Sequence, residues 1–301
     1  MDFLRQGKQG DTRWSGYLLM LFFIVLVFGL IGQLPMTIDA LFTDKAAVQD
    51  GASPFQLMEA FGRNKFFFYL MFPFALTFFT VLIAVKLILK RPWQSILTAR
   101  AVFDWRRLLF ASVILGMIVF SSLLYSIYTN QELHWNFNPT AFFPLLVIAL
   151  VMVPLQIAAE EVVMRGFIFQ VIGASGAKGW HAVVVTGIVF GLLHAANPEV
   201  QALGPWVVSY YILTGLFLGI IVLMDDGLEL AIGYHLVNNL FATLIVTNNW
   251  QAFRTDALFI DLSPPAFGWE NFISLFLVQP LLLFIFSKRF KWTNWRQRFF
   301  Q

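Results

Sequence analysis

Long apolar stretches separated by short polar segments run through the 301 residues of this sequence. A transmembrane helix needs about 20 mainly apolar residues to cross a hydrocarbon core of about 30 Å. With 59% hydrophobic and 12% charged residues, a water-soluble fold could not cover so much apolar surface. The sequence therefore predicts an all-α, polytopic membrane bundle of about eight transmembrane helices. We place the spans near Trp14–Leu34, Phe66–Leu89, Leu108–Tyr128, Ala141–Ile172, His181–Ala196, Leu203–Met224, Leu228–Val246 and Phe272–Phe286.

Lysine and arginine are unevenly distributed between the segments that connect these spans. Only four of the 20 lie on one side of the predicted layout, namely Lys45, Arg63, Lys65 and Arg254. The positive-inside rule assigns the other 16, and both chain termini, to the cytoplasm. The first apolar run has no small-residue cleavage site, so we expect it to remain as the first span.

We expect residues 1–301 to form a single membrane domain in the lipid bilayer. The short loops favour the cytoplasmic membrane of a prokaryote over the endoplasmic reticulum. The tail 287–301 alternates basic and aromatic residues, which favours a position at the cytoplasmic interface. The chain has no cysteine, which excludes disulfides, cysteine nucleophiles and thiolate metal sites. It contains no Gly-rich phosphate loop and no nucleic-acid module, so we expect no nucleic-acid partner.

Two adjacent carboxylates lie in the fourth predicted span, in the motif Glu160-Glu161-Val-Val-Met-Arg165. Residues four apart share a helix face, so Glu161 and Arg165 are expected to pair. Glu160 lies about 100° around the helix and has no local cation. A buried carboxylate without a cation is suited to accept a proton as a general base. The alternative interpretation is a structural ion network between helices.

Histidines occur in two further spans. Phe190 and His194 are four residues apart in the fifth span, so ring and imidazole share a face. His235 and Asn239 have the same spacing in the seventh span, and Asn238 is expected to face elsewhere. The alternative for both pairs is hydrogen bonding between helices, which is a common use of such residues in membranes.

The three motifs are predicted to lie at membrane depth. Counting ~1.5 Å per residue from the cytoplasmic ends of their helices places Glu160 ~18 Å, His235 ~11 Å and His194 ~20 Å deep. Ionisable residues inside spans are costly and usually have a function or a partner. The sequence therefore predicts one polar constellation inside the bilayer.

The ordered motifs resemble those of the CPBP or Abi family, the intramembrane CAAX-processing and bacteriocin-processing proteases that include the Ras-converting CAAX endopeptidase. That family carries Glu-Glu-x-x-x-Arg, Phe-x-x-x-His and His-x-x-x-Asn on successive membrane helices. All three are present here in order, within a predicted catalytic core at residues 141–246.

The resemblance implies a membrane-embedded endopeptidase whose substrate is a peptide or membrane-anchored protein, prenylated or unprenylated. The catalytic residues it implies are Glu160, His194, His235 and Asn239, supported by Glu161, Arg165 and Phe190. Glu160 and His194 would bind and activate water, while His235 and Asn239 would stabilise the oxyanion or help to hold the water or a metal. The resemblance implies a metalloprotease, because family members are often given that name, and Glu160, His194 and His235 are the candidate zinc ligands. The same groups can activate water unaided, and we favour the absence of tightly bound zinc.

Two other functions remain open from the sequence. One is a non-catalytic scaffold or bacteriocin-immunity protein of the same fold, and the other is a transporter or proton relay. We find neither inverted repeats nor paired broken helices, which a transporter is expected to have. Outside the three motifs, Asp225, Asp226 and Glu229 at a short turn are interpreted as a solvated helix cap.

Overall fold

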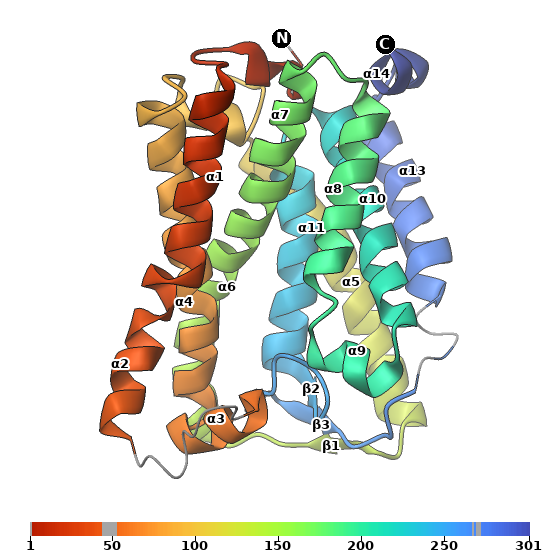
Figure 1. Cartoon of the computed structure of the whole chain (residues 1–301). Helices are drawn as coiled ribbons and strands as arrows, with labels where there is room; N and C mark the ends of the chain where they lie inside the picture. The colour runs from red at the N-terminus through yellow and green to blue at the C-terminus, as the bar shows by residue number, and fades with distance from the viewer. Residues whose placement is uncertain (1, 44–52, 267, 269–271) are drawn as a thin grey trace.

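The protein is described by a computed structural model that covers residues 2–43, 53–266, 268 and 272–301. It is a bundle of long helices packed side by side (Figure 1). The long helices are α1 (Trp14–Gly29), α4 (Arg63–Leu87), α5 (Trp105–Thr129), α6 (Pro139–Glu161), α8 (Gly179–Leu193), α10 (Trp206–Asp225), α11 (Glu229–Leu240) and α13 (Gln279–Arg289). The shorter ones are α2 (Leu34–Phe42), α3 (Pro54–Phe61), α7 (Phe169–Ala174), α9 (Pro198–Leu203) and α14 (Trp295–Phe300).

Each of the eight predicted spans coincides with a helical segment, which confirms the helical bundle. Five helical stretches are long and apolar enough to cross a membrane, at Trp14–Phe42, Arg63–Leu87, Trp105–Thr129, Pro139–Ala174 and Trp206–Asp225. Helix α8 is apolar but shorter. Helix α11 is extended by the π-helical turn Phe241–Ile245, and α13 is preceded by another at Ser274–Val278. The number of spans therefore stays a prediction.

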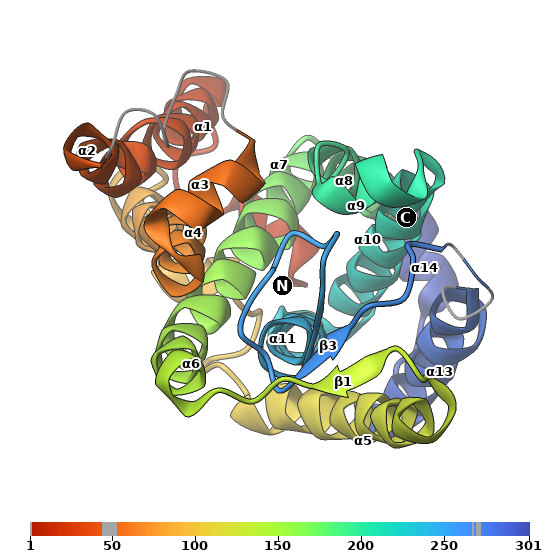
Figure 2. The same cartoon turned by 90° about the horizontal axis from the view of Figure 1, so that it is seen from below.

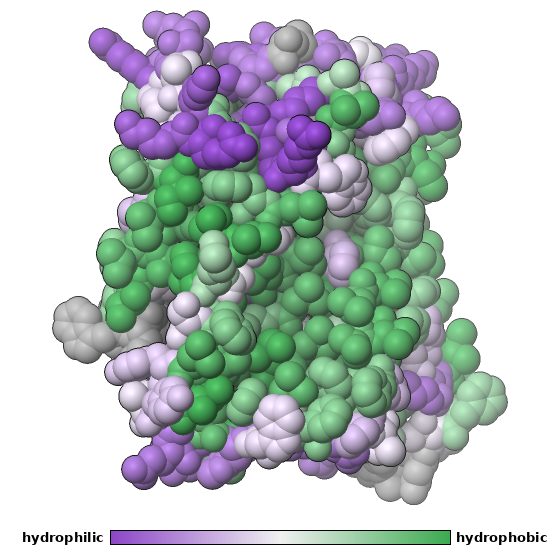
Figure 3. All heavy atoms as spheres, turned by 180° about the vertical axis from the view of Figure 1, so that it is seen from behind, coloured by the Kyte–Doolittle hydropathy of each residue, from purple (hydrophilic) through white to green (hydrophobic). Residues whose placement is uncertain are grey.

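The surface of the bundle has the polarity of a membrane protein. Figure 3 shows a broad hydrophobic belt between two polar ends. Large apolar side chains on the long helices are more than half exposed, for example Leu18 (62%) in α1, Phe120 (58%) in α5 and Val147 (65%) in α6. Both termini lie at the same end of the bundle (Figure 1), as an even number of spans requires. Lys45, which entered the charge comparison, lies outside the described residues.

Helices α8 and α10 approach closely because glycines face each other across their contact. A Cβ atom at Gly215 of α10 would lie 2.8 Å from the carbonyl oxygen of Gly187 in α8. A Cβ atom at Gly191 would lie 2.3 Å from the Ile212 side chain. Small residues are what allow such backbone contact in membranes. This contact fixes the end of α8 that carries Phe190 and His194.

Helix α6 does not end at the glutamates. It passes directly into a π-helical turn, Val162–Ile168, and then into α7, forming one continuous rod (Figure 1). Helix α11 likewise passes into its π-helical turn just after Asn239. Such turns insert a residue into the helix and are frequent at functional sites. Helix α6, which carries the two glutamates, and helix α11, which carries His235 and Asn239, therefore both become π-helical just after these residues.

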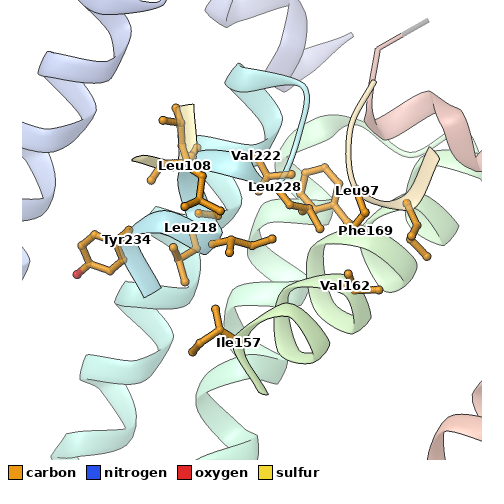
Figure 4. Close-up of a cluster of buried hydrophobic side chains, with 14 of the residues drawn as sticks. Leu97, Leu108, Ile157, Val162, Phe169, Leu218, Val222, Leu228 and Tyr234 are labelled. Carbon is orange, nitrogen blue, oxygen red and sulfur yellow. The ribbon is translucent and has the colours of Figure 1, made fainter. Parts of the chain in front are cut away.

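A buried apolar cluster fixes the positions of α6, α10 and α11 relative to one another (Figure 4). Ile157 and Val162 contribute from the α6 rod, Leu218 and Val222 from α10, and Leu228 from the start of α11. All five are completely buried. In a soluble protein, burying one such side chain away from water stabilises the fold by about 1.5–3 kcal/mol. In lipid, close packing takes over this role.

A three-stranded sheet that the sequence did not lead us to expect lies at the end opposite the termini (Figure 1). Its strands are β1 (Leu133–Trp135), β2 (Val246–Asn248) and β3 (Phe259–Asp261), in the order β1-β3-β2. Strand β1 pairs with β3 antiparallel and β2 pairs with β3 parallel. Figure 2 looks at this end and shows β1 and β3 in front of α5 and α11.

The interpretation of the acidic residues at the α10–α11 turn as a solvated cap was wrong for two of them. The side chains of Asp225 and Glu229 are fully buried. Arg100 lies 3.1 Å from a carboxylate oxygen of each, and Arg107 pairs with Asp225 as well. The distant segment around residue 100 supplies these cations, which local sequence spacing could not indicate. Asp226 is partly exposed and pairs with Arg298 of the tail.

Candidate active site

The predicted pair between Glu161 and Arg165 is present and completely buried. Arg165 Nη1 donates to Glu161 Oε1 at 3.0 Å, and both side chains have no exposed surface. Arg165 Nη2 donates to the carbonyl of Gly215 in α10 at 3.1 Å. The guanidinium also lies 4.5 Å from the centre of the Phe190 ring in α8. One side chain therefore links α6, α8 and α10 behind the site.

His235 of α11 lies between the two glutamates of α6. Its Nδ1 is 3.0 Å from Glu161 Oε1, and its Nε2 is 3.6 Å from Glu160 Oε2. A carboxylate accepts hydrogen bonds, so the Nδ1–H is assigned as the donor to Glu161. The imidazole is thereby oriented with Nε2 towards Glu160. The structure brings together the first and third motifs, as predicted.

Glu160 is held by a residue that the sequence interpretation missed. Gln156 Nε2 donates to Glu160 Oε1 at 2.5 Å, and Gln156 Oε1 accepts from Asn239 Nδ2 at 3.0 Å. Gln156 lies four residues before Glu160, and this spacing is a signal that could have identified it. Asn239 thus joins the site through Gln156. Asn238 faces elsewhere, as expected, and hydrogen-bonds the Tyr234 side chain.

Both Oε2 atoms of the glutamate pair are buried and lack a hydrogen-bond partner among the described residues, and the one that faces His235 Nε2 is that of Glu160. A buried polar atom of this kind calls for an explanation, since buried polar groups are nearly always bonded. Two carboxylates share one guanidinium here, and Glu161 holds it. Glu160 Oε2 is therefore an available proton acceptor beside the His235 imidazole.

His194 is at the C-terminal cap of α8 rather than inside a helix extending to Ala196. Its Nδ1 donates to the Phe190 carbonyl at 2.7 Å, which leaves Nε2 as the acceptor nitrogen. The Phe190 ring is 4.5 Å from the His194 ring and 5.9 Å from the His235 ring. The Tyr211 ring of α10 stacks on the His194 imidazole, with 4.4 Å between the ring centres. The sequence interpretation missed this neighbour.

The three candidate zinc ligands, Glu160, His194 and His235, do not form a ligand cluster in this structure. Within the described part of the chain, no three His, Asp or Glu side chains are grouped so that they could hold a metal ion. His235 Nδ1 is hydrogen-bonded to Glu161 and His194 Nδ1 to a backbone carbonyl, which leaves Nε2 of each imidazole as the nitrogen that could bind a metal. Zinc sites with three protein ligands need all three at about 2.0–2.2 Å. In this arrangement the three side chains are not grouped as such a ligand set, and zinc binding stays a prediction.

Comparison with known proteins agrees with the motifs. Residues 139–241 match the sequence model of the family described as type II CAAX prenyl endopeptidase Rce1-like. The chain is also similar to the uncharacterized protein YyaK of Bacillus subtilis (strain 168), with 29% identity over 197 residues. The match covers 65% of this chain and 66% of YyaK, slightly less than two thirds of that relative. No solved structure matches the chain. All three motifs fall inside residues 139–241, the segment that is similar to this family of endopeptidases.

Proposed function

We propose that this protein is an intramembrane endopeptidase that hydrolyses a peptide bond with a water molecule activated by Glu160. The observation that carries the proposal is the buried, unbonded Glu160 Oε2, 3.6 Å from His235 Nε2. Hydrolysis of an amide needs a base for water, donors for the oxyanion and a proton for the leaving amine. The two glutamates, two histidines and Asn239 contain all of these groups.

In the proposed reaction, Glu160 Oε2 takes one proton from water as the water oxygen bonds to the scissile carbonyl carbon. His194 orients that water through its free Nε2. Asn239 donates an N–H to the carbonyl oxygen on which negative charge develops, and His235 stabilises this charge when its Nε2 carries a proton in addition to Nδ1. The carbon–nitrogen bond then breaks, and Glu160 returns the proton to the leaving amine. No step requires a metal ion, and we propose metal-independent activation.

Glu161 and Arg165 act on His235 rather than on the substrate. Glu161 accepts from His235 Nδ1 and fixes the orientation of the ring, while Arg165 offsets the charge of Glu161. Phe190 packs against both imidazoles and the guanidinium. These residues keep the reacting groups oriented before substrate arrives, which is where much of the rate enhancement of such sites originates.

The substrate we propose is a peptide or membrane-anchored protein that reaches the site from the bilayer, prenylated or unprenylated. The name of the matching family refers to prenylated CAAX substrates. We propose the cytoplasmic membrane of a prokaryote as its location. Both termini, and the side of the bundle to which the positive-inside rule assigns 16 of the 20 lysines and arginines, would face the cytoplasm.

The test compares wild type, Glu160→Gln and Glu132→Gln in lipid vesicles on quenched peptides with and without a prenyl group. Glu132 is exposed and outside the site, so its variant controls for the chemical change alone. We expect Glu160→Gln to lower kcat by about 10²–10⁴-fold, the usual contribution of a general base. Glu132→Gln should match wild type. Full activity of Glu160→Gln would reject the assigned base, and inactivity of wild type on every peptide would favour a non-catalytic scaffold.

A further inference from the structure

Gln156 differs from the other fully enclosed glutamine on the same helical rod. Gln156 is 3% exposed and bonds two side chains, Glu160 and Asn239. Gln170 is 0% exposed and donates to the backbone carbonyl of Ser95 at 2.8 Å. Most side-chain hydrogen bonds in proteins go to backbone or water, so a link confined to two site residues is unusual.

The direction of each hydrogen bond around Gln156 follows from the charge of Glu160. An ionised carboxylate only accepts, so Gln156 must present its NH₂ group to Glu160 Oε1. The Gln156 carbonyl oxygen then faces Asn239, which must present Nδ2. The chain of donors runs from Asn239 through Gln156 to Glu160. It fixes the amide planes of two residues and occupies one of the two Glu160 oxygens.

We propose that Gln156 is a positioning residue that holds Glu160 and Asn239 in a fixed relative orientation for catalysis. The inference rests on the proposed function. By occupying Glu160 Oε1, Gln156 leaves Oε2 as the oxygen that faces His235 and accepts the proton. By accepting one Asn239 N–H, it leaves the other for the oxyanion. Gln156 thus connects α6 to α11 at the level of the reacting atoms.

Gln156→Met tests this role because methionine keeps the length and volume of glutamine without its hydrogen bonds. We expect kcat to fall by about 10²-fold, the cost of misplacing a reacting group by about 1 Å. KM should remain nearly unchanged, because an interaction that matters only in the transition state alters kcat and kcat/KM equally. Gln170→Met, the matched control, should keep wild-type kcat. A wild-type kcat in Gln156→Met, or an equal loss in Gln170→Met, would overturn the inference.

Infrared spectroscopy supplies a measurement that does not depend on activity. The carboxylate band of Glu160 is identified by subtracting the spectrum of Glu160→Gln from that of the intact protein. We expect this band to shift in Gln156→Met and to stay in place in Gln170→Met. A band that stays in place in both variants contradicts the inference even if wild type is inactive. If the band shifts in Gln156→Met but wild type is inactive, the contact between Gln156 and Glu160 is supported and the proposed function is rejected.

Combining Gln156→Met with Asn239→Ala shows whether the two residues act together. Residues in one hydrogen-bond network give non-additive effects. We expect Gln156→Met to lower kcat by less than about 10-fold when Asn239 is already alanine. If the loss of kcat in the double variant equals the product of the two single losses, a role of Gln156 that acts through Asn239 is contradicted.

Discussion

Two pairs of buried carboxylates lie in this bundle, and their surroundings differ. Asp225 and Glu229, near the end that holds the termini, are matched by Arg100 and Arg107. All four of their carboxylate oxygens have a partner, including Trp292 Nε1 and the Asp104 backbone N–H. The two buried carboxylates are matched by two guanidiniums, and Arg107 pairs in addition with the partly exposed Asp104.

Glu160 and Glu161, inside the bundle, have one guanidinium between them. Glu160 Oε2 and Glu161 Oε2 have no hydrogen-bond partner among the described residues. An unpaired buried acceptor costs free energy that a purely structural cluster avoids. The comparison indicates that an unmatched carboxylate, rather than a buried carboxylate as such, distinguishes the site from the structural cluster. The predictions below are ordered by the size of the change expected from each.

The largest difference is expected when one charge is removed from each pair. Asp225→Asn leaves two guanidiniums without their shared carboxylate, and loss of a buried partner costs about 3–5 kcal/mol. Because Arg100 and Arg107 are 24% and 19% exposed, we expect the lower end, about 3 kcal/mol. Glu160→Gln should change stability by less than about 1 kcal/mol, since its amide oxygen can still accept from Gln156.

The free energy of unfolding of both variants would be measured by denaturant titration in mixed micelles. Similar losses for Asp225→Asn and Glu160→Gln would remove the distinction between the two clusters. Destabilisation confined to Asp225→Asn, together with loss of activity confined to Glu160→Gln, would establish it.

A smaller effect is expected at the Phe190 ring, which contacts Arg165 and both imidazoles. Phe190→Leu removes the contact of the ring with the buried guanidinium, which is worth about 1–2 kcal/mol when desolvated. Phe217→Leu in α10 is the matched control, because Phe217 is buried, contacts the Tyr234 ring and has no cation over its ring among the described residues. We expect Phe190→Leu to lower the thermal midpoint more than Phe217→Leu. Equal decreases of the thermal midpoint in the two variants would show that the contact between Arg165 and the Phe190 ring does not stabilise the fold.

The smallest effect is expected from removing metal ions. If a bound cation supplied the positive charge that Glu160 lacks, the site would be as balanced as the Asp225 cluster. Since Glu160, His194 and His235 do not form a ligand cluster, we expect 1,10-phenanthroline or EDTA to leave kcat unchanged. Loss of activity that returns on addition of zinc, but not magnesium, would contradict metal-independent activation.

The sequence alone determined those features that depend on spacing within one helix. The apolar runs indicated the helical bundle, because length and hydrophobicity suffice to predict a span. The four-residue spacing predicted the Glu161–Arg165 pair and the shared face of Phe190 and His194, since the helical repeat places such residues together.

Only the tertiary structure decided which helices meet and at what height. It placed His235 against both glutamates, linked Gln156 to Asn239 and stacked Tyr211 on His194. It also buried Asp225 and Glu229 beside arginines more than 100 residues away. The helical repeat sets the direction of each side chain about its own axis. The axial offset and rotation between helices come from packing of the whole interface, including the glycine contact of α8 with α10 and the apolar cluster between α6, α10 and α11, and no local pattern encodes them.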